Sequence, residues 1–203
     1  VETGNQAGDL ILHPTNNQIL LCATSNGLYR TINGGTTWTQ EQTGDFSQGS
    51  VRFKPNDPTI VYATTKNRFY KSTNTGDTFT NITSGLSIAA QTNRMILDVT
   101  PADNTYVYVL SINGSNALNG IYRSTNGGTN WTKTSGTTDI FESIQAYYDL
   151  ALAVSPTNAD EIYTGCLNVW KSTNGGTTVS KLNSWSNPTG PSYTHADIHY
   201  LGF

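Results

Sequence analysis

Charged side chains are scarce in this chain. Asp, Glu, Lys and Arg together make up 12% of its 203 residues, which is about half the usual share. The formal net charge is −3, and the few Lys and Arg residues form no basic cluster. Because binding to a phosphate backbone needs concentrated positive charge, this balance argues against a nucleic-acid partner.

Several chemical and topological signals are also missing. The sequence has no Ser-His-Asp order, no phosphate-binding loop and no paired-cysteine motif, so we expect no cofactor. No apolar run is long enough to span a membrane, and no signal peptide is recognisable. No sustained helical period is present either. Helical and membrane-spanning folds are therefore poor candidates.

Cysteine is nearly absent, with Cys22 and Cys166 as the two examples. They fall in the same type of apolar segment, but in the first and fourth of the repeats described next. That separation is too great for the few ångströms that a disulfide spans. We expect two buried free thiols and no metal ion; a disulfide bridge or a metal role is the alternative.

What the chain does contain is a short motif in four copies, which begin 41, 52 and 48 residues apart. The copies are Thr31–Trp38, Ser72–Phe79, Ser124–Trp131 and Ser172–Val179. A repeat of this length is typical of the four-stranded blade of a β-propeller. The repeat therefore indicates an all-β chain.

Each copy follows the same series of segments. An aromatic-basic segment precedes the motif, an apolar segment precedes that, and a proline turn with Asn or Asp nearby comes before both. A further short apolar run lies upstream of every proline. Proline and Asx residues form turns for known physical reasons, and the β-branched and aromatic enrichment favours strands between them. Four strands per repeat are predicted.

These units predict a single partial β-propeller over residues 1–203 with about four blades. The expected blades cover 7–45, 46–88, 89–138 and 144–188, and a fifth would begin with a strand at 194–203. Closed propellers have about four to eight blades, so we expect about half of a seven- or eight-bladed ring; a complete four-bladed ring is the alternative. The expected partner of the open blade faces is the remainder of the propeller or another chain.

The motif resembles the Asp-box (BNR) repeat, Ser/Thr-x-Asp-x-Gly-x-Thr-Trp, although all four copies carry Asn in place of Asp. That family includes sialidases, sortilin-like receptors, photosystem assembly factors and xyloglucanase-like hydrolases. We expect structural hairpin turns, with a ligand or calcium loop as the alternative. The expected turn residues are Asn33, Gly35, Trp38, Asn74, Gly76, Phe79, Asn126, Gly128, Trp131, Asn174 and Gly176.

The strongest chemical candidate is the run of His195, Asp197 and His199. Alternate residues of a strand share a face, so the three side chains would project together and could bind a metal or hydrogen-bond a sugar. A polar strand start bonded to neighbouring blades is the plainer alternative. Tyr148 and Tyr193 are candidates for stacking on a sugar, although inter-blade packing also explains aromatic residues at strand ends.

Several acidic residues lie upstream of the prolines. Asp9, Asp98 and Asp149 occur at different offsets from their prolines, so we expect solvated or turn-bonded acids that do not form a set. In the xyloglucanase-like family an acid is expected in the segment that matches residues 23–30, where this chain has Ser25 or Asn26. An amide cannot transfer that proton. The arginine triad and tyrosine nucleophile of a sialidase are not apparent either.

The sequence therefore predicts a secreted or cell-surface bacterial propeller module that binds a glycan or protein or acts as a scaffold, with no catalysis evident in this segment. The richness in Thr, Asn, Ser and Gly and the similarity to secreted Bacteroidetes repeat proteins with type IX secretion favour this location. The main alternative is a portion of a xyloglucanase-like glycoside hydrolase whose catalytic acids lie outside the segment. An assembly-factor or sorting-receptor propeller is the third possibility.

Overall fold

The computed structural model describes residues 5–83, 86, 92–135 and 139–203. In this part of the chain, four antiparallel sheets each contain four strands, which follow one another in chain order. The strands of the first two sheets are β1 (Ala7–Leu12), β2 (Leu20–Thr24), β3 (Gly27–Thr31), β4 (Thr39–Thr43), β5 (Val51–Phe53), β6 (Val61–Thr64), β7 (Phe69–Ser72) and β8 (Thr80–Asn81). Those of the last two are β9 (Thr92–Val99), β10 (Val107–Asn113), β11 (Leu118–Ser124), β12 (Thr132–Lys133), β13 (Ala151–Val154), β14 (Ile162–Gly165), β15 (Val169–Ser172) and β16 (Ser180–Lys181).

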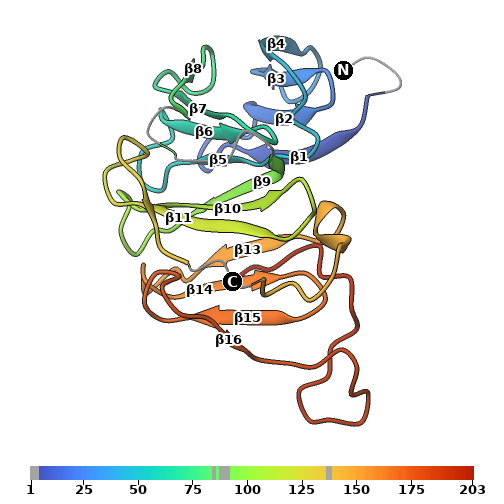
Figure 1. The fold of residues 1–203 in the computed structure, drawn as a ribbon. Coiled ribbons are helices and arrows are strands. Elements are labelled where there is room, and N and C mark those ends of the chain that lie inside the picture. Colours follow the sequence, from blue (N-terminus) through green and yellow to red (C-terminus); the bar gives the residue numbers. More distant parts are fainter. Residues whose placement is uncertain (1–4, 84–85, 87–91, 136–138) are drawn as a thin grey trace.

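The four sheets lie face to face as successive blades (Figure 1). The first strand of each sheet contacts the first strand of the next, in the order β1, β5, β9 and β13. These inner strands therefore face a common axis, and the all-β partial propeller is confirmed. Every strand lies within the limits expected for its blade, while the limits themselves stay predictions.

Each pair of neighbouring blades encloses one apolar cluster. Leu21 and Val61 belong to the cluster between the first two sheets, and Phe69 and Val109 to the cluster between the second and third. A third cluster joins the last two sheets and includes Leu110. Because both faces of an inner blade are buried in this way, stability accumulates through contacts between neighbours, as in other repeat proteins.

The four repeated motifs form the turns between the third and fourth strands of each sheet. In every turn, the hydroxyl of the first motif residue accepts the backbone N–H of the glycine four positions later at 2.9–3.0 Å. The Asn Oδ1 accepts the N–H of the residue four positions later at 2.8–3.0 Å. In the first and third copies, the indole N–H also donates to a glycine carbonyl. The polar side chains thus satisfy backbone groups inside the turn.

In the first three blades, the basic residue that precedes the turn reaches the following blade. The three contacts are Arg30 with Asp77 (2.9 Å), Lys71 with the carbonyl of Gly127 (2.9 Å), and Arg123 with Asp160 (2.7 Å). The repeated aromatic-basic pair therefore has two roles. Its aromatic residue contributes to packing, and its cation joins consecutive blades.

The strand expected at 194–203 is wrong. The structure assigns no strand after β16 in the described residues, and Asp197 has a φ of 74°, which breaks an extended conformation. The segment is nevertheless fixed on the fourth sheet. Ile198 donates its backbone N–H to the carbonyl of Cys166 at 2.8 Å, and its side chain lies close to Gly165.

Cys22 and Cys166 are both free and buried, as expected. Burial raises the pKa of the Cys166 thiol to about 12, which keeps the thiol protonated near neutral pH. Among the described residues, no helix is long and apolar enough to cross a membrane.

Candidate functional site

An ion-pair network connects the inner strands of three blades. The guanidinium of Arg52 on β5 contacts the carboxylate of Asp9 on β1 and lies 3.3 Å from that of Asp98 on β9. Asp9 also accepts the backbone N–H of Val51 at 3.0 Å, and Asp98 accepts that of Val154 at 2.9 Å. Each carboxylate thus holds the inner strand of the next blade.

This arrangement corrects the expectation that Asp9 and Asp98 are unrelated solvated or turn-bonded acids. Burial raises the pKa of Asp98, although Arg52 and two backbone N–H groups counteract the rise. A sequence signal for the pair exists, since Arg52 and Asp98 each lie three residues before the proline of their unit. Equivalent offsets place opposite charges side by side on neighbouring inner strands.

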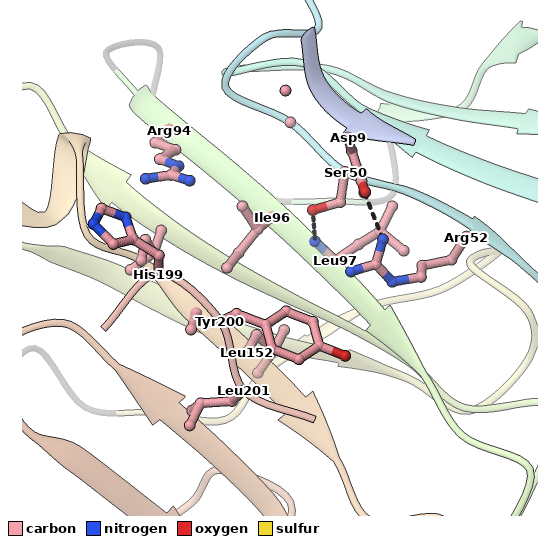
Figure 2. A pocket seen from close by; sticks show the side chains of 14 residues that line it. Asp9, Ser50, Arg52, Arg94, Ile96, Leu97, Leu152, His199, Tyr200 and Leu201 are labelled. Atoms are coloured by element: carbon pink, nitrogen blue, oxygen red, sulfur yellow. Dashed lines mark hydrogen bonds and ion pairs between the residues drawn. The ribbon is translucent and has the colours of Figure 1, made fainter. Parts of the chain in front are cut away.

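Asp9 and Arg52 also line a cavity of about 150 Å³, which we call the mouth cavity. Its lining comes from the four inner strands, the residues just before them, and the segment 194–203. Figure 2 shows Arg94 and His199 at one side of the cavity and Arg52 with Asp9 at the other. Arg94 donates to the backbone carbonyl of Tyr148 at 2.7 Å, and burial lowers its pKa.

A buried carboxylate supports the rim of the mouth cavity. Asp149 has no exposed surface, and its Oδ1 lies 3.4 Å from Nε2 of His199. Burial raises the pKa of Asp149, the neighbouring Asp197 carboxylate raises it further, and His199 and Arg94 partly offset the rise. The expectation that Asp149 is solvated or turn-bonded is wrong, because the apolar run after it carries its side chain into the interior.

The structure separates the five candidate binding residues into two groups. His199 lines the mouth cavity and packs edge-on against Tyr148, with 4.7 Å between ring centroids. Tyr193, His195 and Asp197 line a different hollow. The expectation that both histidines and Asp197 share one strand face is wrong, because the positive φ of Asp197 turns the chain between them.

The second hollow, which we call the loop groove, has a volume of about 670 Å³. It lies between the start of the short 3-10 helix η2 (Gln145–Tyr147), the β14–β15 turn and the loop after β16. Trp185 contributes an exposed indole to the groove. In the described residues, no group of three or more His, Cys, Asp or Glu side chains is arranged to hold a metal ion.

Comparison with known families gives one match over most of the chain. The sequence model of the Sortilin-Vps10 family, described as sortilin, neurotensin receptor 3, matches residues 26–183. The chain belongs to the Sortilin-Vps10 family. Among curated proteins, none matches the sequence.

Solved structures share the fold of this Sortilin-Vps10 family member. An ancestral GH74 enzyme is 17% identical with a TM-score of 0.69, over 90% of this chain and 24% of the enzyme. The GH74 enzyme of Niastella koreensis is 26% identical with a TM-score of 0.63, over 85% and 29%. The extracellular domain of a hybrid two-component system from Bacteroides thetaiotaomicron is 12% identical with a TM-score of 0.63, over 95% and 24%. The chain thus spans less than a third of each of these structures.

Proposed function

We propose that this chain is part of a secreted or cell-surface bacterial propeller that binds a glycan or protein ligand at the end of the propeller where the mouth cavity opens. The observation that carries the proposal is the convergence of four inner strands and the segment 194–203 on one cavity. Ligand sites commonly combine a hollow with a few convergent polar groups. Tyr147 and Tyr148 are more than half exposed beside it and extend the surface that a ligand can contact.

Two features support an Asp-box propeller and an extracellular location. In the turns, the Asn side chain accepts backbone N–H groups, which an Asp at the same position could also accept. This supports Asn as a replacement for the Asp of an Asp-box turn. The fold is shared with an extracellular bacterial domain, and the composition is poor in charge. Export by type IX secretion is part of the same proposal.

A second candidate is a portion of a GH74-like glycoside hydrolase, which the two GH74 structural relatives favour. Under this proposal the catalytic acids lie outside the segment. Asp9 and Asp98 are already bound to Arg52 and to backbone N–H groups, so neither is free to transfer a proton to a substrate. Glycoside hydrolysis needs two such acids across the scissile bond.

The test is to probe the full-length protein on an array of glycans and to assay it for release of reducing sugar from xyloglucan and β-glucan. We expect binding without hydrolysis, and binding that weakens at least ten-fold in His199→Gln. His13→Gln is the matched control, because His13 lies at the opposite end of β1 from the mouth cavity. Sugar release that disappears when one carboxylate is removed would favour the hydrolase instead.

A further inference from the structure

The loop after β16 is closed on itself. At its base, the side-chain amide of Asn183 donates to the hydroxyl of Thr194. Between these residues, Asn187 donates its backbone N–H to Ser184, and Gly190 donates to Asn187. A compact loop with adjoining ends holds its side chains in place, and such loops are frequently functional.

The backbone beneath Trp185 is fixed by a buried amide. The N–H of Trp185 donates to Oδ1 of Asn168 at 2.9 Å, and Asn168 is 1% exposed. The other end of the Asn168 amide donates to Glu142 at 2.8 Å, and Glu142 is also paired with Lys181. The chain thus anchors Trp185 firmly, yet it leaves 43% of the residue exposed. Core packing does not explain a large aromatic residue held in this position.

The groove beside Trp185 has the size and chemistry of a small-ligand site. Its volume of about 670 Å³ falls in the usual range for such sites, roughly 300–1,000 Å³. Tyr193 adds a second partly exposed ring, and Gln145, His195 and Asp197 add hydrogen-bonding groups of both kinds. Rings with an apolar face and a polar edge suit ligands that are themselves part apolar and part polar.

We propose that the loop groove binds one or two pyranose units of a neutral glycan, with a sugar face against Trp185 and Tyr193. The sugar hydroxyls donate to Asp197, to the Gln145 carbonyl and to Nε2 of His195, whose Nδ1–H is directed to the carbonyl of Ala196. They accept from the Gln145 amide. This inference rests on the proposed binding function. It specifies a glycan as the ligand and adds the loop groove as a second binding site besides the mouth cavity. The lining contains one carboxylate and no lysine or arginine, so the groove carries too little charge to select a strongly acidic or basic peptide.

Two polar side chains of the groove lie close together. Asp197 has a left-handed backbone conformation, with a φ of 74°, and its Oδ1 lies 3.5 Å from Nε2 of Gln145. This contact uses one N–H of the Gln145 amide and one oxygen of Asp197, so both groups keep hydrogen-bonding capacity for a ligand.

The experiment is a titration of the full chain with cellotetraose and with a xyloglucan oligosaccharide, followed by the indole N–H signals in an NMR spectrum. We expect the Trp185 signal to shift, while those of Trp38 and Trp131, which are bonded to glycine carbonyls, do not. Trp185→Ala should weaken binding at least ten-fold, and Trp185→Phe by less. Ile32→Ala is the control, because Ile32 is 62% exposed and lines neither the loop groove nor the mouth cavity.

The outcomes separate the two proposals. If Trp185→Ala binds the sugars as tightly as the parent chain while His199→Gln does not, the loop-groove inference fails and the proposed function stands. If no glycan shifts the Trp185 signal at millimolar concentration, the loop-groove inference fails, and the proposed function is decided separately by the glycan array and the His199→Gln variant. Unchanged melting temperatures of the variants show that lost binding does not come from unfolding.

Discussion

Arg52 on β5 lies with its Nε 3.3 Å from Oδ1 of Asp98 on β9, and this contact joins the inner strands of the second and third blades. The same guanidinium contacts Asp9 on β1, so one side chain connects three blades near the propeller axis. All three side chains are less than a third exposed. Removal of Arg52 therefore leaves two partly buried carboxylates without an opposite charge.

The first prediction concerns this network. Arg52→Met should lower the free energy of unfolding by about 2–4 kcal/mol, because it leaves two carboxylates that are largely out of water. Arg52→Lys keeps the charge but cannot contact both carboxylates with a planar fork, so we expect a smaller loss. Chemical denaturation measures both variants. Equal stability of Arg52→Met and the parent chain would show that the network contributes nothing to the stacking of blades.

The second prediction concerns pH and Asp149. Burial and the Asp197 carboxylate raise the pKa of Asp149 in the folded chain, so the folded state holds this proton more tightly than the unfolded state. Stability should then fall as the pH rises from about 4, the ordinary pKa of Asp, through the folded pKa. Asp149→Asn removes this loss. We expect a higher melting temperature than the parent chain at pH 7 and little difference at pH 3.

Asp197→Asn is the partner variant for that measurement. It removes the neighbouring charge and leaves Asp149 buried, so the decline of stability with pH should become weaker but persist. A parent chain whose melting temperature is the same at pH 4 and pH 7, or an Asp149→Asn variant that is less stable at pH 7, would contradict the reasoning. In that case the contact with His199 outweighs the cost of burying the carboxylate.

The blades could be predicted from the sequence because their signals are local. The turn residues, the prolines and the alternating apolar segments each act within a few positions, and four copies in phase repeat the information. The interior position of Asp149 and the position of Trp185 depend on packing between distant segments. Residues 194–203 alternate in the sequence as a strand does, but the left-handed φ of Asp197 prevents an extended conformation. Periodicity alone does not reveal such a turn.

The third prediction comes from the second repeat, where Thr75 replaces the first glycine of the turn. Its φ is 60°, and the glycines at the same position in the other copies have φ between 65° and 67°. A β-branched residue in this region costs about 1–2 kcal/mol, and glycine loses roughly 0.5–1 kcal/mol more entropy on folding. Thr75→Gly should therefore stabilise the chain by about 0.5–1 kcal/mol in thermal unfolding.

Thr73→Gly is the matched control, because Thr73 is an exposed threonine in the same turn and is not among the residues with positive φ. Here glycine only adds entropy to the unfolded chain, so stability should decrease. If both substitutions destabilise the chain to the same extent, the left-handed conformation of Thr75 is not a source of strain.

The last prediction tests how the turns join blades. The second glycine of the fourth turn, Gly176, has a φ of 89°, and a Cβ there would lie 2.8 Å from Ile121 and 2.7 Å from Thr134 of the third blade. Gly35 has nearly the same φ, 91°, but its Cβ would meet only Trp38 at 3.9 Å. Backbone strain should cost both alanine variants about 1–2 kcal/mol, and Gly176→Ala should lose roughly 1–3 kcal/mol more through overpacking. Equal losses in urea denaturation would mean that the turn of one blade does not pack closely on the blade before it.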